Sequence, residues 1–223
     1  MKSSKGFTLI ELIVVIAVFL FVIGAAIGIF ISIMQHQKRI LSEQELLNQA
    51  SYIMEYMSKA MRMARKDLTG DCLIDDQGNS WPGYVYLLTK PDNSTGFYKG
   101  VKFINQSDCD IEGNCACQQF YAEYIDPNNH AMGFILKETK KYNYSESDFP
   151  VFLTSNNLKI NYIRFGVNGR NGCYGAGCAN GAQESDDVQP RITVFLNIQT
   201  QGNESQPIKK IQTTVSQRGL NIK

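Results

Sequence analysis

Histidine and the short sequence motifs of catalysis are scarce in this 223-residue chain. It contains two histidines, His36 and His130, and no G-x-S-x-G, H-E-x-x-H or Walker-type sequence. Those motifs place nucleophiles, zinc ligands or phosphate-binding amides at fixed spacings, so their lack disfavours the commonest hydrolase, metalloprotease and nucleotide-binding designs. We therefore expect a protein that is not an enzyme, with no catalytic residues and no bound cofactor.

The chain also has no excess of positive or negative side chains. The 22 Lys and Arg residues nearly balance the 21 Asp and Glu residues, and the formal net charge is +1. A nucleic-acid-binding surface usually shows a basic stretch interleaved with aromatic residues, and none occurs here. Lys137, Lys140 and Lys141 form only a small cluster that fits a solvent-facing strand edge. No nucleic-acid partner is predicted.

Helix-breaking residues are missing from much of the N-terminal third. No proline precedes Pro82, and no glycine lies between Gly28 and Gly70. Because these two residue types most disfavour a helix interior, a single helix can continue to about Lys66.

Charge is missing from Leu12 to Met34. A helix of these 23 residues would be roughly 34 Å long, enough to cross a hydrocarbon core of about 30 Å. Glu11 stands at its start. An ionisable side chain within a membrane helix costs about 2.5 to 3.5 kcal/mol at the bilayer centre and less near an end, so it usually has a partner or a task. The sequence therefore predicts a spanning helix with a carboxylate that needs an explanation.

The residues around Glu11 offer that explanation. The heptapeptide KGFTLIE at residues 5–11, followed by the apolar run, resembles the N-terminus of type IV prepilins, the precursors of pilins and of type II secretion pseudopilins. The resemblance implies a leader peptide of residues 1–6, cleavage between Gly6 and Phe7 by a prepilin peptidase, and N-methylation of Phe7. It makes Glu11 the fifth mature residue, where this family uses a glutamate in assembly.

The chemistry of such a cleaved end is consistent with the resemblance. Cleavage would create an α-amine on Phe7 with a reference pKa of about 7.7 to 8.0, and positions 7 and 11 lie one helical turn apart. Glu11 could pair with this amine or with that of a neighbouring subunit, and the family is thought to use the neighbour's. A secretory signal fits less well, because its apolar core is about 7 to 15 residues long and ends at a small-residue cleavage site.

Residues 35–67 keep a helical pattern beyond the membrane stretch 7–34. Apolar residues recur three and four positions apart from Leu46 to Ala64, and the other face is charged. This pattern predicts an amphipathic continuation that packs under a sheet, with a coiled-coil seam as the alternative. Within the membrane stretch, Gly24 and Gly28 form a small-xxx-small pattern that would permit close helix packing, or they are ordinary membrane glycines.

Residues 68–223 predict one β-rich globular head. Short β-prone runs alternate with turn signals, and the last two runs read as an antiparallel hairpin. The expected strands are Tyr84–Lys90, Phe97–Ile104, Gln118–Ile125, Met132–Thr139, Val151–Thr154, Leu158–Val167, Arg191–Thr200 and Ile208–Arg218. A head of this size resembles the larger minor pseudopilins of the J type and the corresponding minor pilins. Many major pilins of the family that this chain resembles carry a proline midway along the anchor, and its lack here favours a minor subunit or a pseudopilin.

Six cysteines lie in the predicted head, at Cys72, Cys109, Cys115, Cys117, Cys173 and Cys178. An even number outside the membrane predicts three disulfides and an oxidising compartment. The glycines between Cys173 and Cys178 favour a local bridge. Cys72 would then join one of Cys109, Cys115 or Cys117, and the other two would pair.

Metal binding is not predicted for this head. A zinc site is disfavoured because the cysteines include no paired C-x-x-C and neither histidine lies near them in the sequence. Residues Asp108 to Gly113 resemble the first half of a calcium loop, but position twelve would be Gln119 instead of a bidentate glutamate. A polar disulfide loop is the simpler interpretation.

These features together predict an α+β, pilin-like fold, with one long N-terminal helix packed on an antiparallel β-sheet head. The expected function is that of a minor pilin or minor pseudopilin in a pilus or secretion filament. Its expected partners are prepilin peptidase, other pilins or pseudopilins, the assembly platform and the membrane, with the head outside the cytoplasm. The alternatives are a signal-anchored binding or adhesion domain that does not polymerise and, less favoured, a membrane-tethered enzyme.

Overall fold

The computed structural model describes residues 6–92, 95–126, 128–129, 132–142, 149–155, 158–169, 189–201 and 208–218. The chain divides into two compact units, Met1–Glu45 and Leu46–Lys223. Helix α1 (Leu9–Arg62) contributes residues to both units.

In the first unit, α1 is apolar and exposed. Every residue from Gly6 to Leu41 is exposed, and Glu11 is the only Asp, Glu, Lys or Arg residue between Leu9 and Gln37. By length and composition this helix could cross a membrane. No residue in its most apolar 18-residue stretch is buried against other parts of the chain. The exposed side chains therefore have the character of a membrane anchor.

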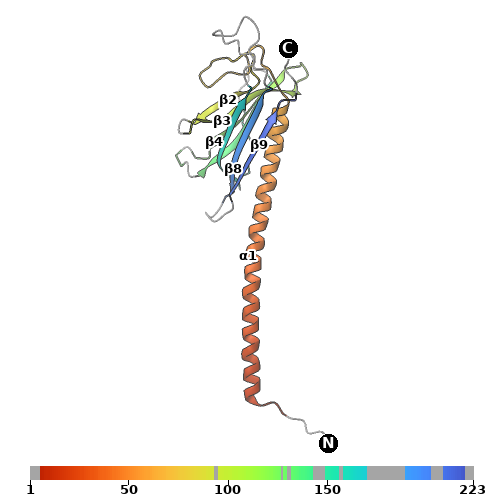
Figure 1. The fold of residues 1–223 in the computed structure, drawn as a ribbon, viewed down its shortest axis with the longest axis vertical. Helices are drawn as coiled ribbons and strands as arrows, with labels where there is room; N and C mark the ends of the chain where they lie inside the picture. The colour runs from red at the N-terminus through yellow and green to blue at the C-terminus, as the bar shows by residue number, and fades with distance from the viewer. Residues whose placement is uncertain are drawn as a thin grey trace. The chain divides into compact units, whose positions relative to one another are not determined.

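In the second unit, the last turns of α1 pack on the sheet. The buried helix residues follow the predicted three-and-four spacing: Leu46, Ala50, Ile53, Met54, Met57, Ala60 and Met61. They join one core with buried side chains of seven strands, β1, β3, β4, β5, β7, β8 and β9. The prediction that this part of the helix packs under a sheet is therefore confirmed (Figure 1).

The helix ends at Arg62, earlier than the predicted Lys66. Ala64 and Arg65 form strand β1 (Ala64–Arg65) by pairing with Asn105 and Ile104. The prediction was too long because this pairing with a distant strand extends the chain, and no local helix breaker marks the position.

The described part of the head forms one antiparallel sheet. Its remaining strands are β2 (Leu87–Asp92), β3 (Phe97–Cys109), β4 (Cys115–Tyr124), β5 (Phe134–Lys141), β6 (Val151–Phe152), β7 (Leu158–Asn168), β8 (Arg191–Thr200) and β9 (Ile208–Ser216). The strand order is β1-β3-β4-β5-β7-β8-β9, with β2 on β3 and β6 on β5. The predicted hairpin of the last two strands is present as β8 and β9.

The two faces of β3 bury different clusters. Phe103 belongs to the main core beneath α1, whereas its neighbour Ile104 belongs to a smaller cluster with Cys72, Leu73 and Leu87. This alternation follows from the two-residue period of a strand. The smaller cluster fixes the loop between β1 and β2 to the other face of the sheet. That loop includes Tyr84 to Tyr86, which were predicted to begin a strand and do not.

The first and last strands of this order, β1 and β9, both lie near the end of α1. The backbone N–H of Arg218, just after β9, donates to the carbonyl of Arg62 at 2.8 Å. The side-chain amide of Gln217 donates to the carbonyl of Ala64 in β1 at 2.8 Å. The C-terminal strand and the helix end are thus joined by hydrogen bonds.

Candidate processing and assembly site

The proposed cleavage junction lies outside the helix. Gly6, Phe7 and Thr8 have no helical backbone, and α1 begins one residue later, at Leu9. The Phe7 side chain is 80% exposed. A bond between Gly6 and Phe7 is therefore accessible without unwinding a helical turn.

Thr8 and Glu11 form a capping box at the start of α1. The Thr8 backbone N–H and hydroxyl both donate to Oε2 of Glu11, at 3.0 and 2.9 Å. In return the Thr8 hydroxyl accepts from the Glu11 backbone N–H at 3.4 Å. This reciprocal pair satisfies donors that every helix start leaves open. The capping box was not predicted, although a threonine followed by a glutamate three residues later, before an apolar run, is its recognised sequence signal.

The capping box gives Glu11 a position as well as a partner. Its carboxylate is held at the helix N-terminus, where the backbone dipoles favour a negative charge. A carboxylate has about four acceptor sites, so the two bonds from Thr8 leave capacity for a further donor. The geometry is thus compatible with an additional contact to an amine.

Gly24 and Gly28 both lie within α1 in the first unit. A Cβ atom built on either glycine would meet no other atom within 4 Å. Within this single chain, their small size is not needed for any contact. Close packing of another helix at these glycines stays a prediction.

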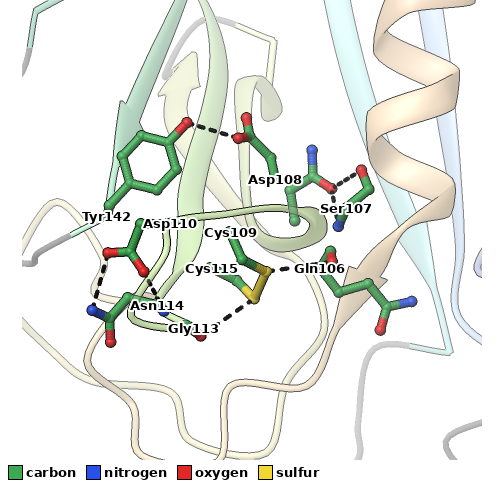
Figure 2. The surroundings of a disulfide bond; sticks show 10 residues. Gln106, Ser107, Asp108, Cys109, Asp110, Gly113, Asn114, Cys115 and Tyr142 are labelled. Carbon is green, nitrogen blue, oxygen red and sulfur yellow. Dashed lines mark hydrogen bonds between the residues drawn. A yellow bond between two sulfur atoms is a disulfide. The ribbon is translucent and has the colours of Figure 1, made fainter.

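Four of the six cysteines form disulfides within the described residues. Cys72 pairs with Cys117, which is one of the three partners that the sequence left open, and Cys109 pairs with Cys115. The Cys109–Cys115 bond closes the loop between β3 and β4 (Figure 2). The predicted pair of Cys173 and Cys178 lies outside the described residues.

The carboxylates of the calcium-like segment are engaged with protein groups. Asp110 accepts the backbone N–H of Asn114 at 2.7 Å and its side-chain amide at 3.1 Å, and Asp108 accepts the Tyr142 hydroxyl at 2.7 Å (Figure 2). Asp108 also accepts from the Lys140 ammonium group at 2.8 Å. These contacts describe a hydrogen-bonded turn. No group of three or more His, Cys, Asp or Glu residues that could hold a metal ion occurs among the described residues.

Asp108 forms an ion pair with Lys140 at 2.8 Å. Partial burial alone would raise the pKa of the Asp108 carboxyl. The hydrogen bonds from Lys140 and Tyr142, with the charge of Lys140, outweigh that effect and lower the pKa below its ordinary value. The carboxyl is therefore held in its charged form, which favours the ion pair.

A buried polar network extends from this ion pair to the helix. Glu138 is 4% exposed and accepts the Tyr56 hydroxyl at 2.9 Å. Gln118 donates to Glu138, and Asn105 donates to Gln118 at 2.8 Å. Lys140 lies 3.7 Å from Glu138. A buried carboxylate needs such partners. This network was not predicted, because its members come from α1, β3 and β4 and no local pattern brings them together.

Comparison with known proteins supports the N-terminal site. Residues 1–27 match the family model of the prokaryotic N-terminal methylation motif. Neither a curated protein nor a solved structure matches the chain significantly.

The matched segment contains the predicted cleavage junction, the capping box and the first part of the exposed apolar helix. In the second unit, the later turns of α1 pack on an antiparallel sheet in the predicted pilin-like α+β manner. This chain therefore carries the N-terminal methylation signature of type IV pilins and pseudopilins.

Proposed function

We propose that the protein is a structural subunit, a minor pilin or minor pseudopilin, of a type IV pilus or type II secretion-like filament. The observation that carries this proposal is the methylation motif at residues 1–27, at the start of an exposed apolar helix. Prepilin peptidase would cut between Gly6 and Phe7 and methylate Phe7. The protein would then wait in the membrane until assembly.

Glu11 is the proposed assembly residue. It is the only ionisable carboxylate or amine in the apolar part of α1, where an unpartnered charge is costly. Thr8 of the same chain supplies two donors, and the amine of a neighbouring Phe7 would add a charged one. An incoming subunit would thus exchange a poorly compensated carboxylate for an ion pair.

The remaining parts follow from this role. Residues 7–34 would embed in the membrane and later in the filament core, where Gly24 and Gly28 would allow close helix contacts with other pilins. The disulfide-containing head would lie outside the cytoplasm, because disulfides persist in oxidising compartments. The assembly platform and neighbouring subunits would be its partners.

Mass spectrometry of the N-terminal peptide tests the processing step. The protein from its native membrane should begin at Phe7 and carry the added mass of one methyl group. An intact Met1 would overturn the proposal and favour a signal-anchored domain that never polymerises.

Substitution at position 11 tests assembly separately. Glu11→Val should leave cleavage intact and abolish incorporation into sheared filaments or crosslinked pilin complexes. Glu11→Asp, which keeps the charge, is the matched control and should retain part of the incorporation. Normal incorporation of Glu11→Val would remove the role proposed for the carboxylate.

A further inference from the structure

A small pocket opens in the head between the β1–β2 loop and the start of β3. Its volume is about 230 Å³, and it is lined by Asp75, Asp76, Trp81, Tyr84 and Tyr98 among others. Ligand pockets for drug-sized molecules are larger, about 300 to 1,000 Å³. The dimensions suit one amino-acid side chain or a small organic ion.

The acidic wall of the pocket is held in place by hydrogen bonds. Asp75 accepts the backbone N–H groups of Gln77 and Asn79 at 2.9 and 2.8 Å, the Asn79 amide at 2.9 Å and the Trp81 indole N–H at 3.1 Å. Asp76 accepts the backbone N–H of Lys90 at 2.9 Å. The carboxylates and the indole are therefore positioned before any ligand arrives, which lowers the entropic cost of binding.

The pocket is negatively charged. Asp75 and Asp76 are its only charged lining residues among those described. The ammonium group of the nearby Lys90 lies instead over the Tyr121 ring, 5.6 Å from its centroid. Hydrogen bonds, foremost from the Asn79 side chain, lower the pKa of Asp75 to about 2, so it stays ionised at all physiological pH values.

Aromatic rings complete the lining. Trp81 and Tyr84 meet edge to face with centroids 5.4 Å apart, a geometry in which at least one ring keeps both faces clear of the other. Trp81, the single tryptophan of the chain, is 37% exposed, so a ligand can reach its ring from solvent. The faces of aromatic rings carry partial negative charge and attract cations, tryptophan most strongly.

We propose that this pocket binds an organic cation, the ammonium or guanidinium group of a basic side chain or of a free amine. The ring faces would contact the apolar part and the charge of the ligand, while Asp76 and Asp75 supply the opposite charge. A neutral sugar would also find rings and carboxylates here, but it would leave the negative charge uncompensated. This inference does not depend on the proposed filament role.

The single tryptophan makes the test specific, because all tryptophan emission comes from this pocket. The full chain is kept in a polyoxyethylene detergent, which contains neither a cation nor a sugar. It is titrated at constant ionic strength with N-acetyl-lysine amide, with N-acetyl-arginine amide and with tetramethylammonium. N-acetyl-norleucine amide, which lacks the charge, and methyl glucoside are the neutral probes.

A saturable emission change with the cations, absent with norleucine and glucoside, is the expected result. If N-acetyl-norleucine amide changed the emission as much as the cations do, the pocket would recognise only the apolar part of a ligand. If methyl glucoside alone changed the emission, the pocket would be a sugar site. Either outcome, or no change with any probe, overturns the proposal. Tighter binding of N-acetyl-lysine amide or N-acetyl-arginine amide than of tetramethylammonium would identify a basic side chain of a polypeptide as the source of the cation. Equal affinity would favour a free amine.

Two variants locate the site while keeping the tryptophan. Tyr98→Ala should weaken cation binding by roughly threefold to thirtyfold through loss of a ring. Asp76→Asn, which keeps an oxygen for the Lys90 amide, should weaken it by about tenfold or less. Asp126→Asn, in the β4–β5 turn, is the control and should bind as the parent does. Unchanged near-ultraviolet circular dichroism confirms folding, and unchanged affinity in both pocket variants contradicts the site.

Discussion

A single buried carboxylate organises the loop that bears the pocket. Asp67 is completely buried and accepts the backbone N–H groups of Gly70, Cys72 and Leu73 at 2.8, 2.9 and 2.7 Å. Its own backbone exchanges hydrogen bonds with Tyr84 and Gly83. One residue thus holds both the start and the end of the loop.

Removing that carboxylate should destabilise the head. Asp67→Ala leaves three amide N–H groups without an acceptor, at roughly 1 to 3 kcal/mol each, so we expect a loss of at least about 3 kcal/mol. Asp67→Asn retains one acceptor oxygen and should lose less. Urea unfolding of the full chain in detergent, followed by circular dichroism, measures both.

The matched control is the adjacent Leu68→Ala, at a side chain that is 76% exposed. It should change stability by no more than about 0.5 kcal/mol. If Asp67→Ala cost no more than this control, the three amides would have to find other acceptors in the folded head.

At the level of single residues, the sequence predicted some roles and missed others for clear reasons. Glu11 was recognisable because its surroundings are local: an apolar run on one side and a basic leader on the other. Its bonds to Thr8 were equally local and could have been predicted from the spacing alone. The role of Glu138 could not be predicted, because nothing in its own strand indicates that Tyr56 and Gln118 lie beside it.

Among the elements, the two described disulfides connect very different lengths of chain. Cys109 and Cys115 are 6 residues apart and close one hairpin loop. Cys72 and Cys117 are 45 residues apart and fasten the β1–β2 loop to the central strand β4. The chain-entropy model assigns a larger effect to the longer closed loop.

Removing each disulfide should therefore have unequal effects. Cys72→Ala with Cys117→Ala should lower the free energy of unfolding by roughly 4 kcal/mol, and Cys109→Ala with Cys115→Ala by roughly 2.5 kcal/mol. Denaturant unfolding of the two double variants, each compared with the parent, gives the difference. An equal loss, or a larger one for the short loop, would contradict this ranking.

The elements themselves were largely predictable. The strands β3 to β5 and β7 to β9 lie within a few residues of the predicted runs, because alternation and turn residues are local signals. The predicted end of α1 was wrong because the residues after Arg62 form β1, which pairs with the distant strand β3. The partner of Cys72 was left open because it depends on the register by which Cys117 faces Ile104 across β3 and β4, which no local pattern encodes.

On the scale of the whole molecule, the helix is part of the head's core. Seven side chains between Leu46 and Met61 are buried, five of them large. The sequence placed the start of the head at residue 68, after the helix. We propose instead that the smallest folding unit begins near Leu46.

Two truncations test this boundary. Residues 46–223, produced in an oxidising compartment, should be soluble and unfold in one cooperative transition. Residues 66–223 should fail to fold, since each lost large apolar side chain removes about 1.5 to 3 kcal/mol, and together they match the whole stability of a typical domain. Circular dichroism and thermal unfolding compare them. A cooperative transition of the shorter fragment would place the boundary after the helix.

The hydrogen bonds at the end of α1 also set how the head would bear force. A pull along the helix loads its buried side chains from Leu46 to Met61 and, at the helix end, the hydrogen bonds of the Arg62 and Ala64 carbonyls and the pairing of β1 with β3. The Arg62 and Ala64 carbonyls accept from Arg218 and Gln217, which follow β9. At the helix end, the hydrogen bonds lead to β9 and the strand pairing leads to β3. Tension is therefore divided between two strands far apart in the chain, and neither border of the sheet has to peel away alone.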